Sequence, residues 1–117
     1  MSSQSRKWKF RIRHMLEAIE RIQQYASGLS RDQLSADTRT LDAIVWNLTV
    51  LGEAANHVPH VITLAYPQIP WPQIRGTRNR IVHGYDQIDF SIVWEVVQSE
   101  LPPLVPVLQQ IMTNEVD

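Results

Sequence analysis

A basic stretch with one histidine and one tyrosine contains the side chains of this chain that are best suited to chemistry. It covers residues 75–86 and reads RGTRNRIVHGYD; we call it the basic motif. It contains Arg75, Arg78 and Arg80, and guanidinium forks bind phosphate oxygens in pairs. Histidine, here His83, gains and loses a proton near neutral pH. Phosphate clamps beside a proton carrier indicate phosphodiester cleavage or transfer. A solvated helix face that ends in a capping histidine is the alternative interpretation.

Helix geometry limits how these side chains can meet. We expect a helix from about Trp71 to His83, with Gly84 as the glycine that ends it. At about 100° per residue, Arg78 and His83 lie roughly 140° apart around the axis, whereas Asn79 and His83 share a face. Either the long arginine side chain bends around to reach the histidine, or another surface completes the site. Two copies meeting about a twofold axis would bring an arginine and a histidine from each chain to one cleft, so we predict a homodimer.

Other candidate sites are weaker. The chain has no cysteine, which excludes thiolate chemistry and zinc–cysteine sites. His57 and His60 are three residues apart, but Pro59 lies between them, and we predict no metal and no cofactor. The sequence contains no glycine-rich phosphate loop. Glu53 lies on a largely apolar segment and is expected to pair either with an arginine of the basic motif or with another basic residue.

Size and composition indicate one globular domain over residues 1–117, with 44% hydrophobic and 20% charged residues. We expect no membrane span and no signal peptide, and hence a cytoplasmic protein, because no long apolar run is present. The formal net charge is −1. A protein that attracts nucleic acid by bulk charge is usually basic, so any nucleic acid must be bound through a local patch.

Apolar residues recur every three or four positions, which predicts amphipathic helices, and no stretch shows the alternation of a strand. The expected fold class is all-α: an antiparallel bundle of four to five helices with a kinked C-terminal helix. We expect the kink near Leu101, because Pro102, Pro103 and Pro106 each remove a backbone hydrogen bond. The predicted helices cover about residues 5–26, 37 or 38 to 55, 71–83 and 89–111, and Asp89 is expected to cap the last. Ser30 and Gln33 offer a capping box for one short turn of helix, and Pro59 either ends the second helix or starts a short one through residue 64. Gly52 is expected to permit close packing of the second helix.

The residues from Arg78 to Tyr85, RNRIVHGY, fit the pattern Arg-x4-His-x-Tyr. This pattern resembles the signature of the HEPN superfamily, and in particular of the HepT-like toxins. The segments HMLEAIERIQQY, LDAIVWNLTVLGEAAN, YPQIPWPQIRGTRNRIVHGY and IVWEVVQSELP are similar to HepT-like proteins in the same order. The resemblance therefore covers nearly the whole chain. It departs at Arg75 and Thr77, where apolar residues are expected, and at Asp86, where an aromatic residue is common.

The resemblance implies a HEPN-like bundle that dimerises and acts as a metal-independent endoribonuclease toxin of a type VII-like toxin–antitoxin pair. It implies inhibition by a partner, an MntA-like nucleotidyltransferase antitoxin that transfers AMP to Tyr85. The alternative is a non-catalytic HEPN subunit that binds a nucleotide or serves as a scaffold for a nucleotidyltransferase. A structural helical dimer with a basic face is a third possibility.

The family's roles carry over to residues of the basic motif. The implied catalytic pair would cleave RNA by attack of its 2′-hydroxyl, and Asp86 adds negative charge beside the RNA. The implied residues are Arg78 and His83 for catalysis, Asn79 and Tyr85 in support, and Arg75 and Arg80 for substrate binding.

Overall fold

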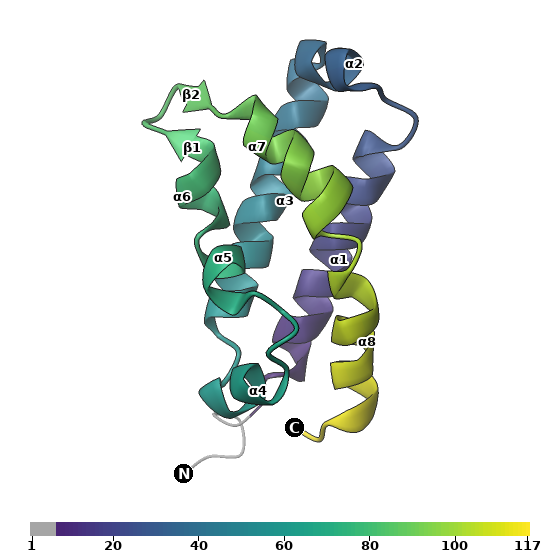
Figure 1. Ribbon diagram of the computed structural model, residues 1–117, viewed down its shortest axis with the longest axis vertical. Helices are drawn as coiled ribbons and strands as arrows, with labels where there is room; N and C mark the ends of the chain where they lie inside the picture. Colours follow the sequence, from purple (N-terminus) through teal and green to yellow (C-terminus); the bar gives the residue numbers. More distant parts are fainter. Residues whose placement is uncertain (1–6) are drawn as a thin grey trace.

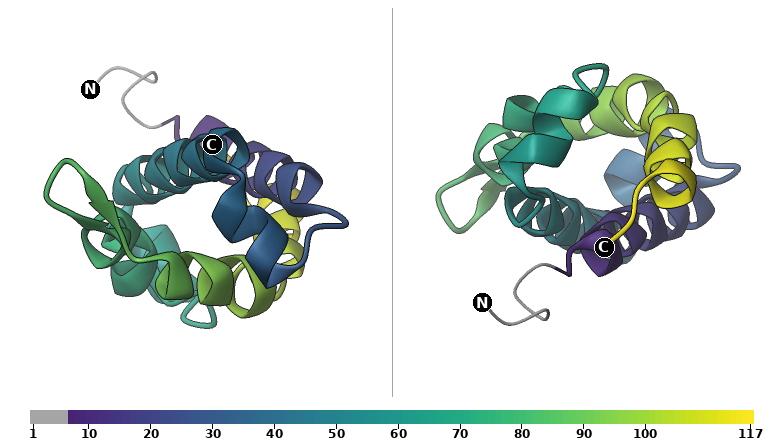
Figure 2. Two further views of the ribbon diagram at one scale, coloured as in Figure 1. Left: turned by 90° about the horizontal axis from the view of Figure 1, so that it is seen from above. Right: turned by 90° about the horizontal axis from the view of Figure 1, so that it is seen from below.

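The computed structural model describes residues 7–117, and helices account for most of them (Figure 1). The two longest helices, α1 (Lys9–Ala26) and α3 (Thr38–Asn56), pack side by side and form one side of the bundle (Figures 1 and 2). Their apolar residues recur at helical spacing and face the core, as predicted. Ser5 and Arg6, at the expected start of the first helix, lie outside the described residues. The fully buried side chains of the long pair include Ile12, Met15, Ile19, Ile22, Ile44, Leu48 and Leu51.

Shorter helices cover the rest of the core. Two of them, between residues 71 and 81, pack on α3, and the helical segments from residue 96 onward pack along α1. Two further short helices lie at opposite ends of the bundle (Figure 1). The all-α bundle predicted from the sequence is therefore confirmed. The bounds are α2 (Arg31–Ala36), α4 (His60–Ala65), α5 (Trp71–Arg75), α6 (Thr77–Ile81), α7 (Phe90–Glu95), a π-helical segment (Val96–Glu100) and α8 (Leu104–Asn114).

Polar side chains cap three of these helices where the sequence predicts helix starts. Ser30 forms a capping box with Gln33 at the start of α2. The Asp37 carboxylate accepts a hydrogen bond from the Thr40 backbone N–H at 3.1 Å and begins α3. Asp89 caps α7 in the same way. Local hydrogen bonding thus fixes where the chain enters these helices.

The prediction of one helix from Trp71 to His83 is wrong in its extent. The chain breaks between α5 and α6 at Gly76, and α6 ends at Ile81. A short hairpin follows, in which β1 (Val82–His83) pairs antiparallel with β2 (Gln87–Ile88). Strands of two residues are too short to leave an alternating pattern in the sequence, so the hairpin was not predicted.

Two details explain this region. Gly84 has φ +76° and lies in the hairpin turn rather than at a helix end, a conformation that favours glycine. Thr77, a departure from the family pattern, is buried and donates its hydroxyl to the backbone carbonyls of Gln73 and Ile74 at 3.1 and 2.8 Å. The polar side chain therefore satisfies carbonyls of α5 at the break between the two helices.

The predicted interruption near Leu101 is confirmed. The Leu101 N–H donates to the Val96 carbonyl at 2.9 Å, the last bond of the π-helical segment. The chain then turns through Pro102 and Pro103 into α8. The π form itself was not predicted. Within the described residues, no helix combines the length and the apolar character needed to cross a bilayer.

Candidate active site

The basic motif lies at one edge of the bundle, and its hairpin projects from that edge (Figures 1 and 2). Arg75 ends α5, Arg78 and Asn79 lie on α6, and His83 lies on β1; all four side chains are exposed. Tyr85 is 98% exposed in the hairpin turn. The fold therefore places these five of the six predicted site residues in solvent on neighbouring short elements.

Because the chain leaves the helix after Ile81, the angle of about 140° between Arg78 and His83 no longer applies. The backbone turns into the hairpin at Val82, whose N–H donates to the Arg78 carbonyl. Within residues 7–117, no hydrogen bond or ion pair joins the side chains of Arg78 and His83. A single copy thus shows both groups on adjacent elements but not joined by a hydrogen bond in the described part of the chain.

The charged neighbour of His83 is Asp89. Its Oδ2 atom lies 3.8 Å from Nε2 of the histidine ring. The sequence predicted Asp89 only as a helix cap, because the hairpin that returns the chain to His83 was not foreseen. The histidine side chain is 56% exposed and the aspartate side chain 35%, so the pair borders solvent.

Arg80 differs from the other two arginines of the motif because it has a carboxylate partner. Its two terminal nitrogens donate to the two oxygens of Glu100, each at 2.9 Å. These hydrogen bonds lower the pKa of Glu100 and raise that of Arg80. The pair connects α6 to the π-helical segment. It uses two of the five N–H groups of the guanidinium, and the predicted role of Arg80 in substrate binding stays a prediction.

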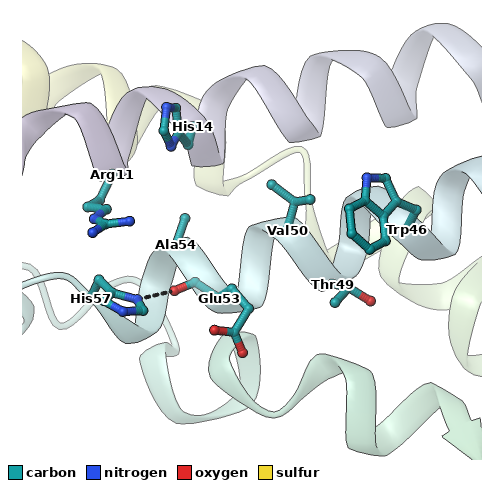
Figure 3. Close-up of a pocket in the computed structure, with 8 residues that line it drawn as sticks. All are labelled: Arg11, His14, Trp46, Thr49, Val50, Glu53, Ala54 and His57. Atoms are coloured by element: carbon teal, nitrogen blue, oxygen red, sulfur yellow. Dashed lines mark hydrogen bonds between the residues drawn. The ribbon is translucent and has the colours of Figure 1, made fainter.

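A separate hollow of about 340 Å³ lies between α1 and α3 (Figure 3). Arg11 and His14 line it from α1, and Trp46 and Glu53 from α3, with His57 just beyond the end of α3. Glu53 is exposed and forms no ion pair in the described part of the chain, so neither an arginine of the basic motif nor another basic residue is its partner there. No residue of the basic motif lines this hollow.

The two histidines that the sequence offers as metal ligands, His57 and His60, lie on different segments of the chain. Nδ1 of His57 lies 2.8 Å from the Glu53 backbone carbonyl (Figure 3). His57 follows the end of α3, whereas His60 begins α4. Among residues 7–117, no group of three or more histidine, aspartate or glutamate side chains is arranged to hold a metal ion.

The fold and the site define a helical-bundle protein with an Arg-x4-His-x-Tyr motif at an exposed edge. Comparison with protein families identifies it further: the chain belongs to the HepT-like ribonuclease family, whose model, described as "Ribonuclease HepT-like", matches residues 15–111. The matched range includes the whole basic motif as well as Asp89 and Glu100. The resemblance inferred from the sequence is thus confirmed.

Curated relatives agree with this family. The chain is 27% identical over 93 residues to "Probable ribonuclease HepT" of Thermococcus cleftensis, covering 80% of this chain and 84% of the relative. A protein of Caldanaerobacter subterraneus subsp. tengcongensis, named as a candidate RNase, is 27% identical over 104 residues, 89% of this chain and 93% of the relative. A protein of Methanocaldococcus jannaschii, also named as a candidate RNase, is 28% identical over 100 residues, 86% and 83% of the two chains. No solved structure gives a significant match.

Proposed function

We propose that this protein is a metal-independent endoribonuclease that cleaves RNA by attack of a ribose 2′-hydroxyl on the adjacent phosphorus. Membership of the HepT-like ribonuclease family and the names of the relatives support an RNase. The observation that carries the mechanism is the exposure of Arg78, Asn79 and His83 on two adjoining elements at one edge. An RNA strand is too large to enter a closed cavity, and such an edge is open to it.

The proposed reaction needs a proton carrier and a stabiliser of negative charge. His83 accepts the proton of the 2′-hydroxyl as the bond from the 2′-oxygen to phosphorus forms. Arg78 stabilises the negative charge that develops on the phosphoryl oxygens, and Asn79 holds either a phosphate oxygen or the ring. The bond from phosphorus to the 5′-oxygen breaks, and that oxygen takes a proton from a second histidine. The products are a 2′,3′-cyclic phosphate and a 5′-hydroxyl.

A second copy of the chain would supply the second histidine. The side chains of Arg78 and His83 form no hydrogen bond with each other within residues 7–117 of one copy, and we propose that a homodimer brings both groups from each protomer to one cleft. Arg75 would extend the phosphate contact, and Arg80 would contribute the N–H groups that Glu100 leaves free. The net charge of −1 and the carboxylate of Asp86 would keep non-specific RNA affinity modest and sensitive to salt.

Tyr85 fits the proposed control by a partner. Its 98% exposure makes the hydroxyl accessible to a modifying enzyme, and we propose that an MntA-like nucleotidyltransferase antitoxin transfers AMP to it. The attached AMP adds bulk and negative charge two residues from His83, which would block RNA. In this proposal the protein is the toxin of a type VII-like pair in the cytoplasm. Mass spectrometry of the protein co-expressed with that partner should find AMP on the peptide containing Tyr85.

The test of the proposed activity compares purified variants on an RNA substrate in the presence of a chelator. We expect the wild-type protein to cleave, and Arg78→Ala and His83→Ala each to lower the rate by about 100-fold or more. All four sites are exposed, so Arg21→Ala and His60→Ala are matched controls that should keep full activity. Failure of the wild-type protein to cut RNA with or without metal would overturn the proposal.

A non-catalytic subunit that binds a nucleotide or supports a nucleotidyltransferase is the second candidate. The net charge of −1 favours it, because RNA-binding surfaces are usually basic. Expression of the protein alone separates the two. A ribonuclease toxin should slow growth and be relieved by its partner, whereas a scaffold should leave growth unchanged.

A further inference from the structure

Asp89 is fixed in place by three elements and faces the ring of His83. Its Oδ1 atom accepts the Ile92 backbone N–H at 3.2 Å and caps α7. Its own N–H donates to the carbonyl of Ile81, the last residue of α6, at 2.7 Å. Between Ile81 and Asp89 the chain forms the hairpin, in which Val82–His83 pairs with Gln87–Ile88. The backbone around Asp89 is therefore held by α6, the hairpin and α7 together.

With Oδ1 engaged in the cap, Oδ2 is the oxygen that faces Nε2 of His83, at 3.8 Å. This separation is within ion-pair range but longer than a hydrogen bond. The His83 side chain is 56% exposed, so a small rotation of this side chain can shorten the distance between Nε2 and Oδ2. A carboxylate only accepts hydrogen bonds. It therefore favours the ring form that carries its hydrogen on Nε2 and leaves the lone pair on Nδ1.

We propose that Asp89 is a positioning residue that sets the tautomer and orientation of the His83 ring. This inference rests on the proposed ribonuclease function for its catalytic consequence. Nδ1 is then the atom that accepts the 2′-hydroxyl proton, and the carboxylate stabilises the imidazolium that forms. The same side chain thus starts α7 with one oxygen and orients the histidine with the other.

Asp89→Asn tests this directly, because asparagine caps helices about as well as aspartate. Its Oδ1 can still accept the Ile92 N–H, which places the Nδ2 amide group opposite Nε2 of His83. An N–H donor at that position favours the opposite ring form, with the hydrogen on Nδ1. Nitrogen-15 NMR of the histidine rings at alkaline pH distinguishes the two neutral forms. We expect the Nε2–H form in the wild-type protein and a shift toward the Nδ1–H form in the variant.

Asp37→Asn is a matched control. Asp37 caps α3 with the same geometry, its Oδ1 accepting the Thr40 N–H at 3.1 Å. No histidine lies within ion-pair distance of Asp37 among the described residues. This substitution should leave the His83 spectrum and RNA cleavage unchanged, so any general effect of removing a capping charge is seen separately.

Kinetics provide the second readout. With the fold retained, Asp89→Asn should lower kcat by about tenfold to 100-fold, because the ring presents the wrong atom, while KM stays within about twofold. An unchanged ring form in Asp89→Asn overturns the inference. Equal kcat for wild type and Asp89→Asn overturns its catalytic part. If the ring form switches but the wild-type protein cuts no RNA, the contact between Asp89 and His83 is supported and the proposed function fails separately.

Discussion

Arg78 and Arg80 are two residues apart, yet their surroundings differ. Arg78 is exposed and makes no ion pair within residues 7–117, whereas Arg80 is held by both oxygens of Glu100. The sequence predicted both as phosphate ligands and offered no means to separate them. Glu100 is 20 residues from Arg80 in the sequence, so only the fold shows which arginine pairs with it. The contact of Asp89 with His83 was missed for the same reason.

The pair of Arg80 and Glu100 predicts a pH-dependent contribution to stability. Hydrogen bonding to Arg80 lowers the pKa of Glu100 in the folded protein. The contribution is therefore present above the pKa of the unfolded chain, about 4.3, and is lost as the pH falls through the lower folded value. Glu100→Gln should cost about 0.5–1 kcal/mol at pH 7, since both side chains are about one-third exposed and water screens them.

Urea unfolding of wild type and Glu100→Gln at pH 7 and at pH 3 measures this difference. We expect the difference between the two free energies of unfolding to shrink from pH 7 to pH 3, because the carboxyl group of Glu100 takes up protons as the pH falls. Glu95→Gln is the control, because Glu95 is exposed and has no ion-pair partner in the described part of the chain. A stability difference that is the same at both pH values would show that the ion pair is not its cause.

At the scale of elements, a close approach between α3 and α5 helps to position the basic motif. A Cβ atom at Gly52 would lie 3.0 Å from the Ile74 carbonyl oxygen and 3.4 Å from that of Arg75. The prediction that Gly52 permits close helix packing is confirmed. The end of α5, which Gly76 connects to α6, therefore packs directly on the backbone of α3 without an intervening side chain.

Gly52→Ala should destabilise the protein by about 1–2 kcal/mol. The added methyl group is overpacked against backbone that cannot move freely, and the higher helix propensity of alanine, about 1 kcal/mol, offsets part of this. Gly76→Ala is the matched control, since φ there is −90° and the nearest atom to an added Cβ is 3.4 Å away. Thermal unfolding of both variants tests the prediction. A Tm for Gly52→Ala at or above that of the wild type would contradict it.

Much of the element order could be predicted from the sequence, because periodicity and capping residues are local signals. Ser30, Asp37 and Asp89 cap helices where expected, and the C-terminal break falls near Leu101. The break at Gly76, the hairpin and the π-helical segment were not predicted. These depend on packing between elements and on strands of two residues, for which the sequence carries no periodic pattern.

For the whole molecule, the proposed site depends on a second copy. Because the proposed cleft needs His83 of both protomers, a dimer of one wild-type chain and one His83→Ala chain should be inactive. Mixing wild-type protein with an equal amount of His83→Ala and allowing subunits to exchange should therefore lower RNA cleavage to about half of that of the wild-type protein alone. Sedimentation at micromolar concentration should show a dimer for each protein and for the mixture.

The matched control mixes wild-type protein with His60→Ala, a variant outside the proposed cleft. This mixture should show the summed activity of its two components. Wild-type protein that sediments as a monomer while cleaving RNA would contradict the shared cleft. A dimeric mixture of wild-type protein and His83→Ala that keeps the full wild-type activity would place a complete site on one chain.

The identity of the product ends tests the central claim most directly. Wild-type protein is incubated with a short oligoribonucleotide and a chelator, and the fragments are weighed by mass spectrometry. Attack by the 2′-hydroxyl predicts 2′,3′-cyclic phosphate or 3′-phosphate ends paired with 5′-hydroxyl ends, formed without metal. Fragments that carry 5′-phosphate and 3′-hydroxyl ends, or cleavage that requires added metal, would contradict the mechanism assigned to Arg78 and His83.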